Sequence, residues 1–337
     1  MHPQTYEICS VPLGNSINSQ VYQIKEKNHP HSLLIAKIYE KKRQYYYEKE
    51  KRILSKISRT NNNAMNDYLI HLSEMNARLD ISKEFKADST LLTFDFLRHG
   101  NILDYVSVKT YGKPFCEMHA KLLCYKLLLG LKKCHDNNIM HNKIDIRNIM
   151  FDENFNPIII HFGDAIITND HHKDFQDLGM VLAELLTSRQ IISYKYNKKM
   201  NKYIFRLHSL HNPIQGKKYE ESLFWKMVET TKNIKISKEF IDFFHELTSP
   251  DNIINVDALL NNEWLKEAIA YQKEIEENFK EEFKCNYMLL SRGEKLINDN
   301  KVNLNSIINL DEMNGTFPSN SLVAEYIENV NKIEMKR

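Results

Sequence analysis

The sequence lacks a strong charge of either sign. Its 337 residues carry 46 basic and 44 acidic side chains, which leave a formal net charge of +2 at neutral pH. Such a balance creates no bulk field that would attract the chain to nucleic acid or to an anionic membrane. We therefore expect neither of these among its partners.

Closely spaced cysteines and long apolar runs are also missing. The five cysteines are scattered without a CxxC pair, which is typical of free thiols in a reducing compartment. No apolar run is long enough to span a bilayer. The stretch MHPQTYEICSVPLGNS at the N-terminus has no signal-peptide or transit-peptide pattern. These absences predict a cytoplasmic protein.

The pattern that is present begins as β-structure and then becomes helical. Strand-like apolar runs occur at 21–25, 32–39, 69–75 and 89–96. Helical apolar spacing occurs at 45–57, 116–138, 175–188, 223–231, 238–247 and 255–283. A small β-rich part followed by a larger helical part predicts an α+β fold.

One stretch at 141–165, HNKIDIRNIMFDENFNPIIIHFGDA, has the layout of a catalytic loop, a hairpin and a metal-binding turn. IAK at 35–37 and the helix EKEKRILSKI precede it, and the apolar helix DFQDLGMVLAELL follows it. In this order the motifs resemble a eukaryotic protein kinase domain of the serine/threonine type, with a layout like that of calcium/calmodulin-dependent kinases. The resemblance covers about residues 6–266 and depends on the ordered set of motifs.

The resemblance implies a bilobal fold. Residues 1–96 would form the small β-rich N-lobe, and 97–268 the larger helical C-lobe with a truncated activation segment. Residues 269–337 would form a helical C-terminal extension and a tail.

The resemblance also implies a vestigial nucleotide site between the lobes. In the loop LGNSINSQV, glycine is kept at one family position and Ser16 and Ser19 hold the next two, so an ordinary β-turn is an equally open interpretation. The positions that match the family's nucleotide-binding residues are Gly14, Val21, Ala36, Lys37, Glu50, Phe94 as gatekeeper, Asn148 and Met150.

The lysine and glutamate of this set have two open interpretations. In kinases this lysine contacts the α- and β-phosphates and pairs with the helix glutamate. The pair Lys37–Glu50 could equally hold the helix against the sheet without any nucleotide. Glu48 remains an alternative partner for Lys37.

The catalytic loop HNKIDIRN departs from the family's His-Arg-Asp-Leu-Lys-x-x-Asn where the reaction needs it. His141 and Asn148 match, but Lys143 replaces the catalytic-base aspartate and Asp145 replaces the following lysine. A protonated lysine cannot accept a hydroxyl proton at neutral pH, and losing a general base costs about 10²–10⁴ in rate. A carboxylate at Asp145 would also repel the γ-phosphate.

The metal-binding turn is altered too. His161 stands where the family has its aspartate, and an imidazole nitrogen suits Zn²⁺ or Cu²⁺ better than Mg²⁺. Asn148 remains one ligand candidate, and Asp164 could substitute only from a different face of the loop. We expect no metal site.

The substrate-binding segment is short. DAIITNDHHK separates Gly163 from Asp174, without the family's Ala-Pro-Glu, and its one phosphorylatable side chain is Thr168. The segment SPDNIINVDAL at 249–259 also lacks the arginine that pairs with the family's glutamate. Both partners of that ion pair are therefore absent together.

Architectural positions are kept. The family's stacked hydrophobic column matches Leu54, His141 and Phe162, and Asp174 matches its anchor. Because core residues remain while reaction residues are lost, we expect a catalytically inactive pseudokinase, without a cofactor, that acts as a scaffold or regulatory component. Two alternatives stay open: a divergent active kinase that uses Asp145 or Asp164, and a module that senses ATP without transfer.

The expected partners are proteins of a larger assembly, bound through the tail at 269–337 or through the C-lobe. A cytoskeletal or ciliary complex is a guess within the cytoplasmic expectation. The basic run KYNKKMNKY at 195–203 could meet an acidic partner, but a solvated loop is favoured. The histidines of HPH (29–31) and HH (171–172) are expected in solvated loops.

Overall fold

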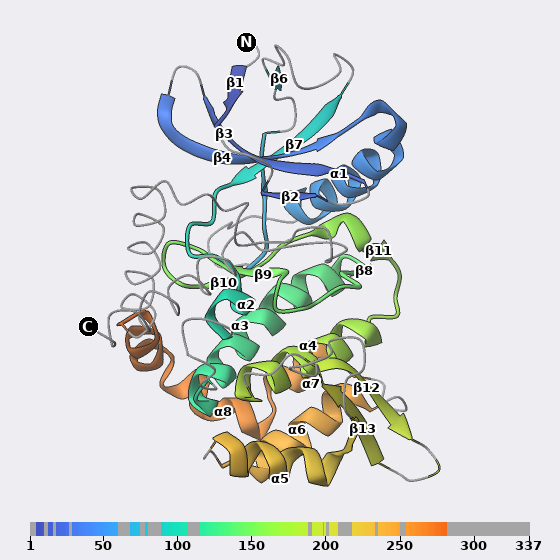
Figure 1. Cartoon of the computed structure of the whole chain (residues 1–337), viewed down its shortest axis with the longest axis vertical. Helices are drawn as coiled ribbons and strands as arrows, with labels where there is room; N and C mark the ends of the chain where they lie inside the picture. Colours follow the sequence, from blue (N-terminus) through green and yellow to red (C-terminus); the bar gives the residue numbers. More distant parts are fainter. Residues whose placement is uncertain are drawn as a thin grey trace, which may run out of the picture.

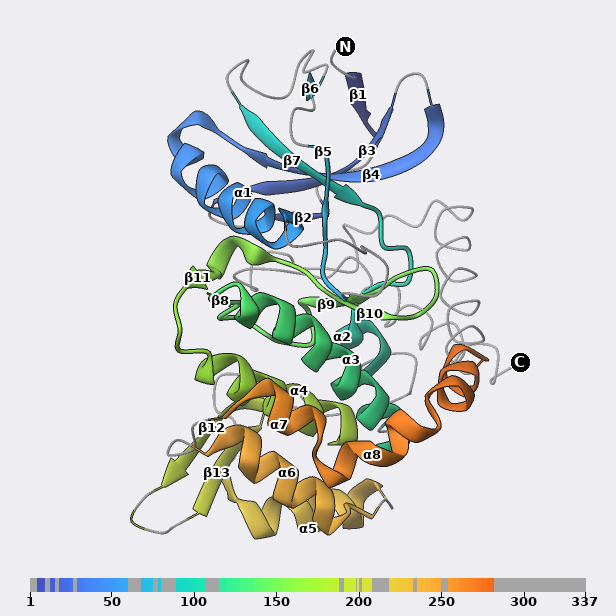
Figure 2. The same cartoon turned by 180° about the vertical axis from the view of Figure 1, so that it is seen from behind.

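The computed structural model has two parts stacked along the long axis of the molecule, a β-sheet and a larger helical body (Figures 1 and 2). This arrangement confirms the predicted bilobal α+β fold. The structure describes residues 5–9, 13–15, 18–26, 29–59, 68–74, 78–79, 89–106, 115–187, 191–197, 199, 202–207, 218–232, 235–249 and 254–281.

The N-terminal sheet has seven strands in the order β5-β7-β4-β3-β1-β6, and β2 pairs with β3 off this path. Its central strands are rich in Ile, Leu, Val and Tyr, which pack well on a pleated surface. The strands are β1 (Thr5–Ile8), β2 (Gly14–Asn15), β3 (Gln20–Glu26), β4 (His29–Tyr39), β5 (Leu72–Glu74), β6 (Arg78–Leu79) and β7 (Thr90–Asp95).

Strand alternation gives this sheet two apolar faces. On the face toward the helical body, β4 contributes Ile35, Lys37 and Tyr39, and the apolar residues there join the main core. The register places Lys37 opposite Val21 and opposite Leu92, so these side chains share that face. The outer face carries a separate cluster of Tyr6, Tyr22, Ile24, Ala36, Ile38 and Leu91.

Helix α1 (Gln44–Arg59) lies between the sheet and the helical body (Figure 2). Its apolar residues recur at helical spacing, so that Ile53, Leu54 and Ile57 are buried on one side. Glu50 is only 2% exposed on the same helix. A buried carboxylate needs a partner, and this one defines the candidate site below.

Helices α3 and α4 form the centre of the helical body, with the later helices packed around them (Figure 1). Polar side chains start several helices by accepting a hydrogen bond from a free backbone N–H. These N-caps are Asn101, Cys116, Ser237, Asn255 and Asn262. The helices are α2 (Ile102–Asp104), α3 (Glu117–Asp136), α4 (His172–Thr187), α5 (Glu221–Lys232), α6 (Lys238–Thr248), α7 (Val256–Leu260) and α8 (Glu263–Ala270).

Two small antiparallel sheets hold the loop between residues 141 and 148. Strand β8 (Ile139–Met140), just before the loop, pairs with β11 (Ile166–Ile167). Strand β9 (Ile149–Phe151), just after it, pairs with β10 (Pro157–Ile159). The 3-10 turn η3 (Phe162–Asp164) follows β10. Both ends of the loop are therefore fixed by backbone hydrogen bonds.

The prediction of a solvated loop at 195–203 is wrong. This run belongs to the hairpin of β12 (Ile191–Asn197) and β13 (Lys202–Leu207), and β14 (Lys218–Glu220) completes a three-stranded sheet. Phe205 of β13 is fully buried and stacks on Phe224 of α5, with ring centroids 4.1 Å apart. That aromatic anchor holds strands whose lysines had suggested a loop.

The expected continuous helix at 255–283 is also interrupted. It is divided into α7, α8 and a helical segment at 272–281. Asn261 caps the end of α7, and Asn262 then starts α8, because its side chain accepts a hydrogen bond from Trp264 N at 2.9 Å. Residues 282–337, which include most of the predicted tail, lie outside the described part of the chain.

The cysteines of the described residues, Cys9, Cys116, Cys124 and Cys134, are free thiols, and Cys285 lies beyond those residues. No helix in the described ranges is both long and apolar enough to cross a bilayer.

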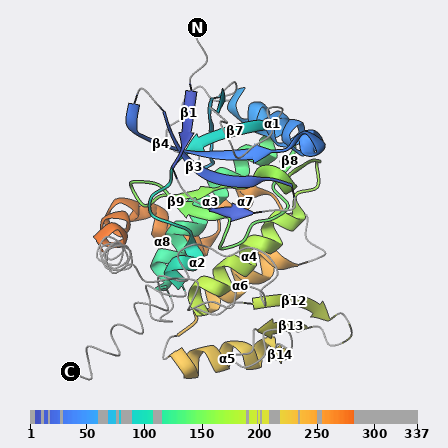
Figure 3. The ribbon, with the colours of Figure 1, turned by 45° about the horizontal axis from the view of Figure 1, so that its top comes forward.

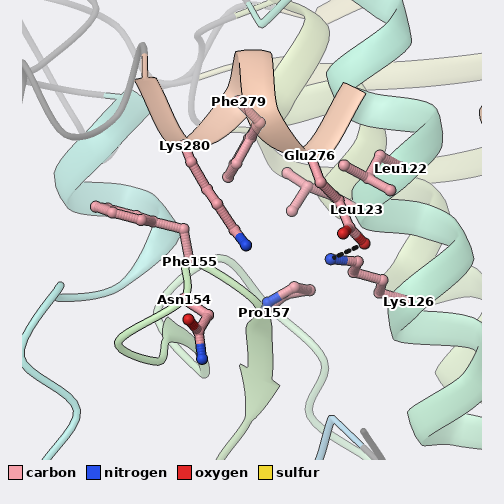
Figure 4. Close-up of a pocket in the computed structure, with 9 residues that line it drawn as sticks. All are labelled: Leu122, Leu123, Lys126, Asn154, Phe155, Pro157, Glu276, Phe279 and Lys280. Carbon is pink, nitrogen blue, oxygen red and sulfur yellow. Dashed lines mark ion pairs between the residues drawn. The ribbon is translucent and has the colours of Figure 1, made fainter. Parts of the chain in front are cut away.

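The helical segment 272–281 packs against α3 and the turn between β9 and β10 (Figure 4). At its centre the buried Lys126 Nζ lies 2.8 Å from Glu276 Oε1 and 2.6 Å from Asn156 Oδ1. Burial lowers the pKa of Lys126, and the hydrogen bond with Glu276 opposes that shift. A pocket beside this pair is lined by Leu122, Leu123, Lys126, Asn154, Phe155, Pro157, Glu276, Phe279 and Lys280.

We predict that Glu276→Gln lowers the free energy of unfolding by about 1–3 kcal/mol, because the buried Lys126 ammonium loses its anionic partner. Urea denaturation measures the change. Glu277→Gln, at an exposed position on the same segment, should change it by less than about 0.5 kcal/mol. Equal effects of the two substitutions would contradict this account of the ion pair.

Candidate functional site

The candidate site lies where the inner face of the sheet meets η3 and the loop at 141–148. Lys37 Nζ lies 2.7 Å from Glu50 Oε2 and 2.9 Å from Glu50 Oε1, and both side chains are buried. Glu48, the alternative partner, instead accepts a hydrogen bond from Gln44. The structure therefore selects Glu50 as the partner of Lys37.

Tyr39 is a third member of this group that sequence reasoning missed. Its hydroxyl donates to Glu50 Oε2 at 2.5 Å. Burial, and then the neighbouring carboxylate, raise the pKa of Tyr39 far above its ordinary value, so the phenol stays a donor. The signal was available, because a residue two positions after Lys37 on the same strand shares its face.

Gly163 lies directly beneath this buried group. A Cβ atom at Gly163 would lie 3.1 Å from Glu50 Oε2 and 3.5 Å from Lys37 Nζ, which is too close for the Glu50 carboxylate to stay in place. Lys49 of α1 also donates to the carbonyl oxygen of Gly163 at 3.2 Å. The turn and α1 are therefore packed as one unit.

The loop at 141–148 is fixed by the buried carboxylate of Asp174. Its oxygens accept hydrogen bonds from His141 N at 2.8 Å and from Asn142 N at 2.7 Å. His135 Nε2 lies 2.9 Å from the same carboxylate. Asp174 thus lies at the position predicted for the anchor and holds the start of the loop.

The residues of the predicted hydrophobic column lie in one core. The His141 and Phe162 rings form an edge contact with centroids 4.9 Å apart, and Leu54 belongs to the same buried cluster as Phe162. Burial lowers the pKa of His141, so the ring is neutral at pH 7. Its Nε2 then donates to the carbonyl oxygen of Ile160 at 2.9 Å.

The residues that replace the catalytic base and the metal ligand, Lys143 and His161, contact the same residue of the turn. Lys143 Nζ lies 3.0 Å from Asp164 Oδ2, and His161 Nε2 lies 3.2 Å from the same oxygen. Facing a carboxylate, this imidazole nitrogen must be the donor. His161 has a left-handed backbone with φ 72° and ψ 64°. The hydrogen bond from His161 lowers the pKa of Asp164 well below its ordinary value, and Lys143 contributes in the same direction.

Asp145 is used within its own loop. Its Oδ1 accepts hydrogen bonds from Arg147 N at 2.7 Å and from Asn148 N at 3.2 Å. Asn148 in turn donates through Nδ2 to the carbonyl oxygen of Lys143 at 3.0 Å. Both side chains therefore stabilise the turn that ends the loop.

One predicted adenine contact is wrong. Ala36 belongs to the outer-face cluster of the sheet, because it is adjacent to Lys37 and alternation turns it away. Ile35 takes the inner face and lies opposite the buried Phe94. A branched side chain therefore stands where the sequence analysis had placed a methyl group.

Two further predicted nucleotide positions lie on β3 and β9. Val21 lies opposite Lys37 and also pairs in register with Gly14 of β2. Met150 of β9 is half-buried and bridges to Asn101 at the start of α2. Residues 16–17 of the predicted glycine loop at 13–21 lie outside the described residues.

The segment after η3 runs directly into α4. Thr168 N donates to the carbonyl oxygen of Asn138 at 2.8 Å, which continues the pairing of β11 with β8. His171 stacks on His135 with ring centroids 4.1 Å apart, and burial lowers its pKa. The expectation of solvated loops is thus wrong for His171. It is also wrong for His172, which begins α4, and for the histidines at 29–31, which lie in β4.

Comparison with known proteins decides the family. The sequence pattern described as "Protein kinase domain" matches residues 9–177, which is half of the chain. The chain belongs to the protein kinase domain family. The match spans the sheet from β2 onward, the loop at 141–148, η3 and the start of α4. These are the elements that the sequence analysis used for the resemblance to kinases.

A similar protein is the "Probable serine/threonine-protein kinase samkA" of Dictyostelium discoideum. It is 36% identical over 75 residues, which cover 22% of this chain and 12% of that protein. The likeness is therefore to a small part of a much longer kinase.

The residues present do not fit the Mg²⁺ that kinases use. Mg²⁺ requires hard oxygen ligands in near-octahedral geometry, but His161 supplies nitrogen. The Asp164 carboxylate already contacts Lys143 and His161. Within the described residues, His, Cys, Asp and Glu form no group of three or more suited to a metal ion.

We predict that Asp164 stays ionised below about pH 4, where an ordinary aspartate becomes protonated. Because its folded pKa is depressed, its stabilising contribution is present above the ordinary value and is lost as the pH falls through the folded pKa. Carboxyl ¹³C NMR titration measures this. His161→Ala and Lys143→Met should each raise the midpoint; an unchanged midpoint in both would contradict the assigned contacts.

Proposed function

We propose that this protein is a catalytically inactive member of the kinase family, a pseudokinase that serves as a scaffold or regulatory component of a protein assembly. The observation that carries the proposal is the contact of Lys143 and His161 with one carboxylate oxygen of Asp164. Lys143 stands at the position of the catalytic base and His161 at that of the metal ligand. Because both side chains contact Asp164, they stabilise the loop and the turn instead of facing a substrate.

The absence of a suitable base supports this proposal. Lys143 Nζ lies 3.0 Å from Asp164 Oδ2, and an ammonium group cannot accept the proton of a substrate hydroxyl. Asp145, the displaced base of the alternative hypothesis, is directed at backbone N–H groups of its own loop. Asp164, the other alternative, is engaged by two donors that depress its basicity.

The adenine side of the cleft gives weaker but independent support. Ile35 replaces the small side chain expected on the inner face and lies opposite the buried Phe94. A larger side chain at this position leaves less room for an adenine ring against the inner face of the sheet. We therefore propose that nucleotide binding is weak or absent.

The kinase-like contacts that remain in this chain support a role in binding other proteins. Lys37 and Glu50 still join α1 to the sheet, and Asp174 still fixes the loop. A buried ion pair of this kind is retained when it specifies one geometry, although it adds little net stability. A fixed two-lobed surface without chemistry is suited to holding partner proteins, through the C-lobe or through the chain beyond residue 268.

The second candidate is an ATP-sensing module, which the buried Lys37–Glu50 pair favours because it is the phosphate-contacting pair of kinases. This hypothesis requires that the protein binds ATP without transferring its phosphoryl group. An active divergent kinase would have to bind ATP and also transfer the phosphoryl group. Two measurements separate the three hypotheses.

In a phosphotransfer assay with Mg²⁺ or Mn²⁺ and generic protein substrates, we expect the wild-type protein to give no signal above that of Lys37→Ala. The physical reason is the missing base and metal ligand, of which the base alone accounts for about 10²–10⁴ in rate. Metal-dependent transfer that disappears in Lys37→Ala would overturn the proposal in favour of an active kinase.

In thermal denaturation with saturating ATP, we expect no shift for the wild-type protein and a positive shift for Ile35→Ala, which enlarges the cleft. A ligand that binds only the native state at 100 times its Kd stabilises it by about 2.7 kcal/mol. A clear wild-type shift would support the ATP-sensing candidate. Ala36→Gly, on the outer face, is the matched control and should not create nucleotide binding.

A further inference from the structure

The three-stranded sheet of β12, β13 and β14 lies at the end of the molecule farthest from the N-terminal sheet (Figures 1 and 3). One face of this sheet is anchored, because Phe205 stacks on Phe224 and makes an edge contact with Trp225 at 5.7 Å. Since side chains alternate along a strand, the residues on either side of Phe205 belong to the outward face.

Strand register defines that outward face. Lys195, Ile204 and Glu220 form one row across the three strands, and Arg206 lies opposite Lys218 in the next row. Lys195 and Lys218 are exposed, and the other three side chains are partly exposed. We call these five residues the basic sheet face.

The sequence around this face carries mostly positive charge. Glu220 is the one acidic residue between 191 and 220, in a chain whose total charge is nearly balanced. The basic residues of that span are Lys195, Lys198, Lys199, Lys202, Arg206, Lys217 and Lys218.

This concentration of charge is unfavourable for the isolated sheet. Arg206 and Lys218 are direct cross-strand neighbours, and like charges in that position are destabilising. Lys195 and Lys218 form no ion pair with any residue that the structure describes. A bound group of opposite charge would compensate the exposed Lys195 and Lys218.

The outer strands add backbone groups to the charge. In the described sheet, β12 and β14 each pair on one side, with β13 between them. An outer strand presents unpaired N–H and C=O groups to which an extended polypeptide can add. Glutamate or aspartate at alternate positions of such a strand would lie on the same face as Lys195 or Lys218.

We propose that the basic sheet face, with its outer strands, binds an extended acidic segment of a partner protein. The half-buried Ile204 at the centre suits contact with another side chain. None of the described side chains on this face is an aromatic on which a base could stack. These features favour an acidic polypeptide over nucleic acid. The inference deepens the proposed scaffold role and depends on it.

The test uses the full chain and a fluorescein-labelled peptide of alternating glutamate and threonine, about ten residues long, in a fluorescence anisotropy titration. We expect binding that weakens as salt is added. Lys195→Glu with Lys218→Glu should weaken it about tenfold or more. The matched control is Lys226→Glu with Lys238→Glu, two exposed lysines on α5 and α6, which makes the same charge change and should leave binding within about twofold.

Each other outcome overturns the proposal. Equal losses in both double variants would assign binding to bulk charge. Tighter binding of a single-stranded oligonucleotide or of phosphatidylserine vesicles than of the acidic peptide would assign the face to those ligands. The segment 302–331 of this chain contains four acidic and no basic residues. If neutralising Asp311, Glu312, Glu325 and Glu328 tightens peptide binding about tenfold, the chain's own segment occupies the face.

The result is separable from the proposed function. Peptide binding without phosphotransfer supports both proposals, and transfer with intact peptide binding removes the pseudokinase assignment alone. Absence of peptide binding together with absence of transfer removes this docking surface and leaves the pseudokinase proposal standing.

Discussion

The carboxylate of Asp174 is the interaction on which the loop at 141–148 depends. It has no exposed surface, and its charge is stabilised by the backbone N–H groups of His141 and Asn142 and by the ring of His135. Removing such donors from a buried carboxylate would leave an uncompensated charge, which costs several kcal/mol. Because His141 packs on Phe162, the anchor also fixes the turn beneath α1. One buried carboxylate therefore holds two parts of the kinase fold together.

The same loop carries side chains that neutralise one another. Lys143 and Asp164 form an ion pair across the cleft, which His161 supports from the turn. These side chains are about half exposed, so the contact contributes little to global stability. Its consequence is local, because Lys143 at the base position contacts Asp164 of the turn η3 and so joins the loop at 141–148 to that turn. These contacts indicate that the replacements at positions 143 and 161 fit together structurally. A single isolated loss of a catalytic residue would not produce such a contact.

The kinase-like architecture could be predicted from the sequence because its motifs are short and occur in a fixed order along the chain. Lys37, Glu50, His141 and Asp174 could be placed from motif spacing, and the structure brings Lys37 to Glu50 and His141 to Asp174. Ala36 failed because a shift of one residue along a strand reverses the face, and the motif alone did not fix which residue pointed inward. The β12–β13 hairpin was missed because its burial depends on one aromatic residue meeting a helix distant in sequence. The Asp164 contacts could not be foreseen, since they join two segments whose approach only the folded chain determines.

The segment at 272–281 has a consequence for where this protein can be divided. The resemblance to kinases ends near residue 266, yet Ala268 and Ile275 share one apolar cluster with Leu122 of α3. Phe279 also packs near Phe115 and Phe151. A protein shortened near residue 266 would expose this cluster and leave Lys126 without its anionic partner. A shortened protein that keeps this packing therefore has to extend through residue 281, beyond the residues that resemble kinases.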